Sequence, residues 1–177
     1  LAARGKQSDK LLYEGALPQQ VDAVVTKFGI PMGPFTMSDM AGLDIGWRIR
    51  QEERKAGTLS AEKERLYRVA DTFIESGRHG QKTGKGFYTY AAGDRKGAED
   101  PEIVAHYRVE AARQGIAQNK PADAEIVERV LLRLASAGAQ ILDEGIAMRA
   151  SDIDTVYLAG YGFPAWRGGP MWQVENV

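Results

Sequence analysis

Apolar side chains recur at three- and four-residue steps along most of the chain, which is the period of an amphipathic helix. One run predicts a helix that begins at Pro18 and ends at Gly29, because proline suits the first helical turn and glycine the residue after the last. Its apolar face carries Val21, Val24, Val25 and Phe28. Another helix follows Ser60, a good N-cap residue, and stops near Gly77. Its apolar face carries Leu66, Val69, Ala70, Phe73 and Ile74. The pattern predicts an all-α protein.

The same period, bounded by glycine and proline, predicts further helices. They cover residues 7–15, about 36–55, 101–115, 123–145 and a short stretch that Ser151 would cap. Between them, residues 78–86 form a basic, glycine-rich loop, and residues 87–90 form an extended segment too short for a sheet of its own. The sequence contains neither a strand–helix–strand alternation nor a GxGxxG motif. We therefore expect no nucleotide-binding Rossmann domain in this chain.

Two parts of the sequence repeat the same landmarks in the same order. Glu14-Gly15, Val21-Asp22, Phe28-Gly29-Ile30-Pro31 and Gly33-Pro34 recur as Glu144-Gly145, Ile153-Asp154, Tyr161-Gly162-Phe163-Pro164 and Gly169-Pro170. The separation is too long for a solenoid repeat. It predicts two tandem copies of one helical domain, the first over residues 1–92 and a second, truncated copy over residues 93–177. The alternative is a chance similarity of two helix–turn–helix segments that are both built from glycine and proline.

Composition and charge narrow the function classes. The chain has 177 residues, of which 44% are hydrophobic and 27% charged, as in ordinary globular proteins. A formal net charge of −1 does not suggest a nucleic-acid or anionic-membrane partner. The absence of cysteine excludes a disulfide framework and thiolate metal sites. No apolar run approaches the roughly 20 residues that a membrane span needs. Leu1 lies in what the pattern predicts to be the middle of a helix, so we expect a longer parent protein.

Two sets of motifs resemble a known family, the 3-hydroxyacyl-CoA dehydrogenases. The segments 11–15, 28–35 and 38–44 (LLYEG, FGIPMGPF and SDMAGLD) are similar to the helical C-terminal domain of these enzymes. The segment 80–88 (GQKTGKGFY) resembles the closing loop of that domain. The segment 161–170 (YGFPAWRGGP) is similar to the duplicated domain of the multifunctional fatty-acid oxidation enzymes.

The resemblance implies an NAD-dependent enzyme of fatty-acid β-oxidation that oxidises (3S)-3-hydroxyacyl-CoA. In the family, a preceding Rossmann domain binds NAD and carries a His–Glu pair that removes the hydroxyl proton. This chain has only His79 and His106, neither in the family's catalytic context, so we assign no catalytic residue and no metal ligand. The chain is expected to supply one wall of the acyl-CoA cleft and to be inactive alone. Because single-copy relatives dimerise through this domain, two copies in one chain predict an intrachain pseudo-dimer, and hence a monomer or weak dimer.

Two residues are candidates for ligand contacts. Lys82 matches the lysine of the family's KTGxGFY loop, which reaches the cofactor, so the resemblance implies an NAD contact; otherwise it is a solvated loop charge. Tyr161 lies in the region of the second copy that approaches the acyl-CoA in the multifunctional enzymes, and is a candidate substrate contact; otherwise it packs over its own turn. Asp22 and Asp154 occupy matching repeat positions and are expected to bond turn amides. Trp166 and Arg167 are expected to pack at a domain interface, with a cation–π pair as the alternative.

Two other functions fit the pattern less closely. One is a helical scaffold or interaction module without a ligand, and the other is the C-terminal domain of a different β-hydroxyacid dehydrogenase. The expected location is the cytoplasm, or the peroxisome if the source is eukaryotic.

Overall fold

Helices account for most of the chain in the computed structural model, which describes residues 2–176. The α-helices are α1 (Ala2–Tyr13), α2 (Pro18–Phe28), α3 (Pro34–Ala41), α4 (Leu43–Lys55), α5 (Ala61–Glu75), α6 (Pro101–Gln114), α7 (Asp123–Asp143), α8 (Ala150–Gly160) and α9 (Pro170–Glu175). Two 3₁₀ turns are η1 (Gln81–Thr83) and η2 (Ala165–Arg167). Extended pairing within the described residues is limited to isolated bridges in the loop that follows α5. The all-α prediction is confirmed.

The helix boundaries follow local chemistry, with two corrections to the predicted ones. Ser60 is the N-cap of α5, and its hydroxyl accepts a hydrogen bond from the backbone N–H of Lys63 at 3.2 Å. The single helix predicted over residues 36–55 is wrong, because Gly42, with a φ of 95°, divides it into α3 and α4. The Ser151 cap is also wrong. Helix α8 begins one residue earlier, after Arg149, whose backbone N–H donates to the Asp152 carboxylate at 3.1 Å.

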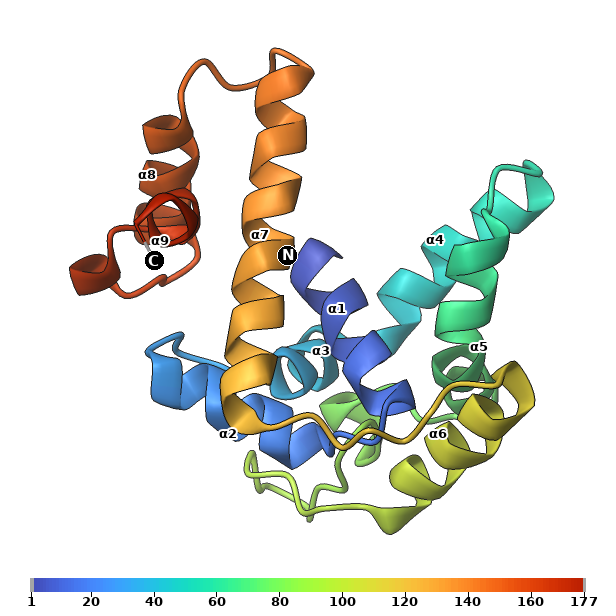
Figure 1. Cartoon of the computed structure of the whole chain (residues 1–177). Coiled ribbons are helices and arrows are strands. Elements are labelled where there is room, and N and C mark those ends of the chain that lie inside the picture. Colours follow the sequence, from blue (N-terminus) through green and yellow to red (C-terminus); the bar gives the residue numbers. More distant parts are fainter. Residues whose placement is uncertain (1, 177) are drawn as a thin grey trace.

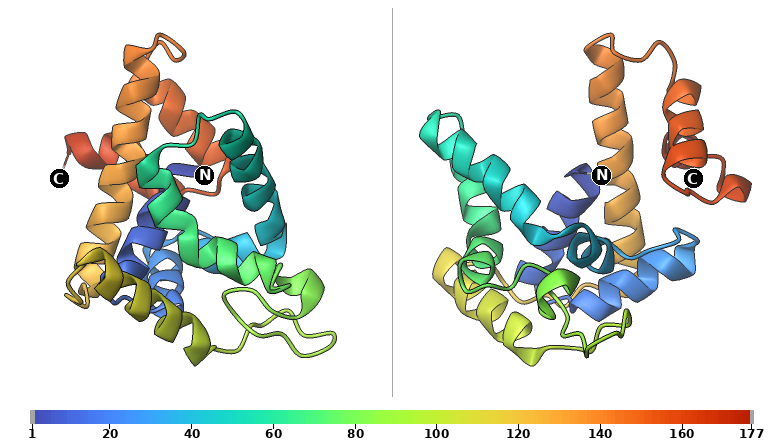
Figure 2. Two further views of the ribbon diagram at one scale, coloured as in Figure 1. Left: turned by 90° about the vertical axis from the view of Figure 1, so that its right-hand side faces the viewer. Right: turned by 180° about the vertical axis from the view of Figure 1, so that it is seen from behind.

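Helix α1 lies at the centre of the arrangement. It packs against α7 on one side and against α5 and α6 on the other, with α3 beneath it (Figure 1). The pair α4–α5 lies on one side of α1, and α7 lies with α8 and α9 on the other side. The view from behind shows the same arrangement (Figure 2). One apolar core extends from the first half of the chain into the second. Its fully or almost fully buried members include Leu11, Val21, Phe35, Ile103, Tyr107, Ile126, Val130 and Leu134.

The two repeated aspartates cap two equivalent helices. Asp22 of α2 accepts hydrogen bonds from the second and third backbone amides of α3, those of Phe35 at 2.9 Å and Thr36 at 2.8 Å. Asp154 of α8 accepts from the second and third amides of α9, those of Met171 at 2.8 Å and Trp172 at 3.1 Å. A carboxylate at a helix N-terminus satisfies otherwise unpaired N–H groups and opposes the positive end of the helix dipole. The expectation that both aspartates bond turn amides is met by these contacts.

The two glycine–proline turns pack against each other reciprocally. A Cβ atom added to Gly29 would lie 2.9 Å from the Pro164 side chain, and one added to Gly162 would lie 2.7 Å from the Pro31 side chain. Each turn thus places its glycine against the proline of the other. The Phe28 and Phe163 rings complete the contact edge to face, with centroids 5.7 Å apart.

A buried acid holds α1 to α6. Asp9 is buried, and its carboxyl accepts a hydrogen bond from the Tyr107 hydroxyl at 2.9 Å. The Tyr107 ring packs edge to face on Tyr13, with centroids 5.0 Å apart. Burial raises the pKa of Asp9 to about 7, while the Tyr107 hydrogen bond and the charge of Arg50 act in the opposite direction. Asp9 is therefore largely protonated in the folded chain at pH values where it is ionised in the unfolded chain.

This difference predicts a pH-dependent effect of Asp9→Asn. The folded pKa lies above the unfolded one, so the wild type loses stability as the pH rises from about 4 to 7. The asparagine amide does not titrate, and its carbonyl oxygen still accepts the Tyr107 hydrogen bond. The variant should match the wild type near pH 4 and exceed it at pH 8 by up to about 4 kcal/mol, measured by urea unfolding. The exposed Asp143→Asn serves as control, and a D9N advantage that does not grow with pH would refute the assignment.

Candidate functional site

The glycine-rich loop after α5 is anchored by one buried carboxylate. Asp39 of α3 is 1% exposed. It accepts hydrogen bonds from the backbone amides of Phe87 at 2.8 Å and Tyr88 at 3.0 Å, and from the Tyr90 hydroxyl at 2.9 Å. Burial raises the pKa of Asp39 to about 6, and the two backbone hydrogen bonds limit that rise. The Tyr88 hydroxyl in turn donates to Asp22 at 2.9 Å, so both aspartates hold the same segment.

A buried arginine fixes the other side of this loop. The Arg78 guanidinium donates to the Gly86 carbonyl at 2.7 Å and to the Asp100 carboxylate at 2.7 Å. It also reaches Glu102 at 2.9 Å, in the first turn of α6. Arg78 therefore connects the loop to the helix that follows it.

Lys82 lies in η1, at the outer edge of the anchored loop. Its ammonium group forms an ion pair with Asp44 in the first turn of α4, and its side chain is 51% exposed. The hydrogen bond from Lys82 lowers the pKa of Asp44, which also pairs with Arg48 at 3.3 Å. The lysine is thus a half-exposed cation whose position is set by a carboxylate on a neighbouring helix.

Tyr161 lies in a different part of the molecule, directly after α8. It is 43% exposed, and its ring lies against Tyr157 with centroids 5.3 Å apart. It borders a small cavity shared with Arg4 of α1 and Phe163. No residue among those described contacts both Tyr161 and Lys82, so the two candidate residues do not share one set of neighbours.

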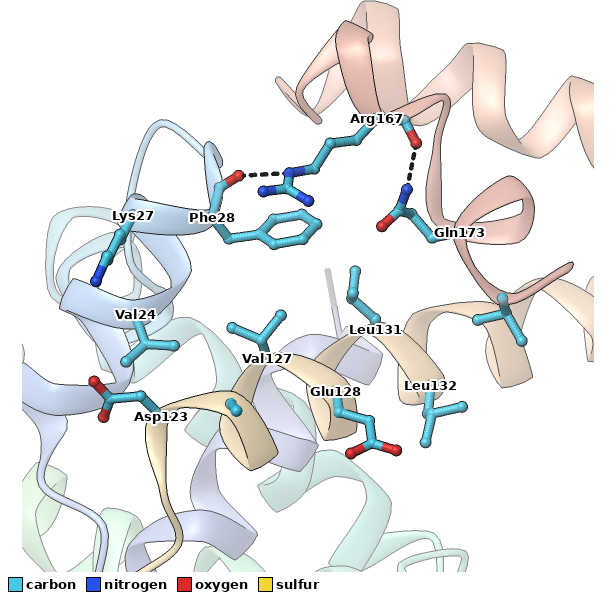
Figure 3. A pocket seen from close by; sticks show the side chains of 12 residues that line it. Val24, Lys27, Phe28, Asp123, Val127, Glu128, Leu131, Leu132, Arg167 and Gln173 are labelled. Atoms are coloured by element: carbon cyan, nitrogen blue, oxygen red, sulfur yellow. Dashed lines mark hydrogen bonds between the residues drawn. The ribbon is translucent and has the colours of Figure 1, made fainter. Parts of the chain in front are cut away.

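Arg167 joins η2 to the end of α2. Its Nε donates to the Phe28 carbonyl at 3.1 Å, and its guanidinium lies over the Phe28 ring at 4.1 Å (Figure 3). The guanidinium also lies 4.0 Å from the centroid of the Trp166 ring. The cation–π alternative for the Trp166–Arg167 pair corresponds to this arrangement, whereas the Trp166 side chain is 73% exposed. Arg167 also borders a groove of about 790 Å³, which runs between α2, α7 and α9. Apolar side chains cover most of it, among them Val24, Phe28, Val127, Leu131, Leu132 and Val174.

The two histidines make structural contacts. His79 Nε2 lies 3.1 Å from the Ile74 carbonyl, and His106 packs its ring on Phe73, with centroids 5.1 Å apart. Across residues 2–176, no group of three or more potential ligand side chains is placed to hold a metal ion. None of the helices in that range is both long and apolar enough to cross a membrane.

The glycine-rich loop lies within a segment that matches a known protein family. The model of the 3-hydroxyacyl-CoA dehydrogenase C-terminal domain matches residues 1–90, which is just over half of the 177-residue chain and includes the whole loop. The chain belongs to this family.

The relatives of this family domain are multifunctional enzymes. The peroxisomal bifunctional enzyme of Danio rerio is 44% identical over 181 residues, covering 97% of this chain and 25% of the relative. That of Homo sapiens is 41% identical over 179 residues, covering 94% and 24%. The dehydrogenase part of multifunctional enzyme 1 from C. elegans superposes with a TM-score of 0.69 at 28% identity, over 92% of this chain and 35% of that structure. The chain spans about a quarter of the length of the curated relatives it matches.

Sequence reasoning found the loop of this family domain but not the residues that hold it. Asp39 is buried, although its local sequence is that of a solvated or helix-capping carboxylate. Its partners lie 48 and 49 residues further along the chain, so no local pattern indicates them. The glycine at position 86 is a local indication that another group approaches the loop closely, because a Cβ atom there would lie 2.0 Å from the Asp39 carboxylate.

Two carboxylates of the family domain should respond differently to the same change. Asp39→Asn turns an amide NH₂ toward the N–H donors of the loop, so the variant should lose about 2–3 kcal/mol of stability. Asp44→Asn removes only a half-exposed ion pair and should change stability by less than about 1 kcal/mol. Urea unfolding monitored by circular dichroism measures both. Equal losses in D39N and D44N would contradict the anchoring role of Asp39.

Proposed function

We propose that the chain is the C-terminal helical part of an NAD-dependent (3S)-3-hydroxyacyl-CoA dehydrogenase of fatty-acid β-oxidation, where it forms one wall of the acyl-CoA cleft. The observation that carries the proposal is the extent of the similarity. The family model matches residues 1–90, whereas the bifunctional enzyme of Danio rerio is similar over 97% of the chain. Similarity therefore continues through the second half, as expected if the whole chain belongs to such an enzyme.

In this proposal the reacting groups lie on a Rossmann domain outside the chain. Bound NAD⁺ supplies the acceptor for the hydride that leaves C3 of the hydroxyacyl group. The present chain contributes binding and orientation, and it excludes water from one side of the cleft. The general base for the hydroxyl proton is assigned to the Rossmann domain, so the chain alone is proposed to be inactive.

Lys82 is proposed as the cofactor contact of this chain. Its half-exposed ammonium can approach a phosphate or ribose oxygen, and the anchored loop fixes where that ammonium lies. Asp44 already pairs with the lysine, so the cofactor would compete with, or add to, that pair. An exposed ionic contact is worth only about 0–1 kcal/mol, and the rest of the cofactor affinity must come from the Rossmann domain.

Tyr161 is proposed as a contact for the acyl-CoA substrate. Its exposed fraction leaves one face of the phenol accessible, while the Tyr157 ring supports the other. A phenol combines an apolar ring with a hydroxyl, which suits a ligand that carries both an acyl chain and polar groups.

We infer that the chain holds two copies of one helical domain, over residues 1–92 and 93–177. The equivalent Asp22 and Asp154 caps and the reciprocal glycine–proline turns support this inference. The turns make the kind of self-complementary contact that a two-fold dimer interface makes, in which each surface meets its own equivalent. The second copy would thus supply inside one chain the contact that a partner subunit supplies in single-copy enzymes.

The relatives also suggest a compartment. Those of Danio rerio and Homo sapiens are named as peroxisomal enzymes. We propose the same location for the parent protein if its source is eukaryotic, and the cytoplasm otherwise.

Activity is tested with a chimera. The 177-residue chain alone should give no NADH from 3-hydroxybutyryl-CoA and NAD⁺. The same chain should support NADH formation when it replaces the corresponding segment of the Danio rerio bifunctional enzyme. Activity of the chain alone, or a folded but inactive chimera, would contradict the proposal.

The cofactor contact is tested in that chimera. Lys82→Ala should raise the KM for NAD⁺ about three- to tenfold, corresponding to about 1 kcal/mol, and leave kcat within about twofold. Lys85→Ala, in the same loop, is the matched control and should leave both constants unchanged. If K82A and K85A behave alike, Lys82 is not a specific cofactor contact.

The duplicated arrangement is tested by the reciprocal turns. Gly29→Ala and Gly162→Ala should each cost about 2–3 kcal/mol, because both add a clash across the contact to the strain of a positive φ. Gly115→Ala has a φ of 69° and open space around it, so it should show the strain alone, about 1 kcal/mol. Sedimentation of the wild type should give a monomer or weak dimer. A tight dimer at micromolar concentration, or three equal losses, would count against the pseudo-dimer.

A further inference from the structure

Arg4 is a buried cation without a counter-ion among the described residues. It lies in α1 and is 6% exposed. Its Nη2 points to the Met37 sulfur at 3.1 Å, and its Nε has no hydrogen-bond partner. None of the ion pairs described between residues 2 and 176 includes it. Burial lowers the pKa of Arg4, although an arginine remains charged at neutral pH.

The charge of the Asp22 carboxylate acts on the Arg4 guanidinium. However, its oxygens accept the amides of Phe35 and Thr36, the Thr36 hydroxyl at 2.6 Å and the Tyr88 hydroxyl at 2.9 Å. A carboxylate in this state cannot turn toward the guanidinium without losing the cap of α3. Leaving a buried charge unpaired costs several kcal/mol, so a compensating anion is expected.

A small cavity adjoins this guanidinium. It measures about 10 Å³, room for about one water-sized atom, and is bordered by Arg4, Ile30, Leu134, Tyr157, Tyr161 and Phe163. Burial raises the pKa of Tyr157, so its phenol stays a hydrogen-bond donor at neutral pH. Among the described residues, neither the Tyr157 hydroxyl nor the Tyr161 hydroxyl has a hydrogen-bond acceptor. The other three side chains that line the cavity, Ile30, Leu134 and Phe163, are apolar. The cavity is therefore bordered by one cationic group, the Arg4 guanidinium, and by two tyrosines, Tyr157 and Tyr161.

We propose that Arg4, with Tyr157 and Tyr161, forms a binding site for a single-atom anionic group: a halide ion, or one oxygen of a carboxylate that comes from outside the described residues. The cavity admits one atom, so a polyatomic anion could place only a single oxygen in it, and a carboxylate oxygen is less crowded by its neighbours than an oxygen of a sulfate or phosphate group. The site lies between α1, α7 and α8, which contribute Arg4, Leu134 and Tyr157, so the bound anion would neutralise the charge that these helices enclose. It does not depend on the cofactor contact proposed for Lys82, and it shares only Tyr161 with the proposed substrate contact.

The test measures thermal stability of the 177-residue chain as the anion concentration rises. Sodium chloride and, separately, sodium formate are varied from about 5 to 300 mM. Ionic strength is held constant with sodium isethionate, whose sulfonate oxygens are each flanked by two further oxygens and therefore enter a one-atom cavity less readily than a formate oxygen. Chloride probes the free halide and formate probes the carboxylate oxygen. Arg4→Met is the matched variant, because methionine keeps an unbranched side chain against Met37 and removes the charge.

The wild type should gain at least about 3 °C in Tm with chloride, formate or both, whereas R4M should gain less than about 1 °C. A response to chloride alone identifies a halide site, and a response to formate alone or to both identifies a carboxylate site. R4M should also melt above the wild type at the lowest anion concentration, because the uncompensated charge is gone. Identical responses of the two proteins would overturn the proposal.

A direct measurement does not depend on whether R4M folds. Crystals of the wild type grown in sodium bromide should show an anomalous bromide peak within hydrogen-bonding distance of the Arg4 guanidinium. Absence of that peak, together with a Tm that does not respond to formate, would likewise overturn the site.

Discussion

The position of the glycine-rich loop depends on two carboxylates buried beneath it, Asp22 and Asp39. Both are withdrawn from water, and both accept hydrogen bonds from N–H and O–H donors in its place. Tyr88 links them, since its backbone amide donates to Asp39 and its hydroxyl to Asp22. Helices α2 and α3 and the loop are therefore fixed by one polar network inside an otherwise apolar core.

The second half of the chain repeats the simplest part of this network. Asp154 caps α9 through backbone amides, as Asp22 caps α3. Asp22 accepts two further hydroxyl groups, those of Thr36 and Tyr88, because in the first half the loop returns over the cap. The common element is thus the helix pair with its capped turn, and the two turns form one of the contacts between the halves. The reciprocal packing of the turns explains why glycine and proline recur there at matching positions.

Periodicity was sufficient to predict the helices whose apolar faces are continuous, such as α2 and α5, and the glycine-rich loop between α5 and α6. It did not predict the break at Gly42, because a lone glycine is tolerated inside a helix and only its φ of 95° shows that the chain turns there. The buried polar residues were harder still. Asp39, Arg78 and Arg4 have the sequence context of solvated charges, and their roles depend on partners distant in the chain. Lys82 was singled out by family resemblance rather than by its chemistry.

The pairing of Lys82 with Asp44 limits how that lysine can act. A half-exposed pair contributes little free energy, so Asp44 can orient the ammonium without holding it tightly. Asp44 also pairs with Arg48 and sits in the first turn of α4, where the helix dipole favours its charge. The carboxylate would therefore remain stabilised if Lys82 turned toward a phosphate. A ligand anion does not have to overcome the full attraction of the pair, only the difference between two partly hydrated contacts. For a residue proposed to meet a cofactor that is held mainly by another domain, this weak restraint keeps the ammonium in position and leaves the affinity to the other contacts.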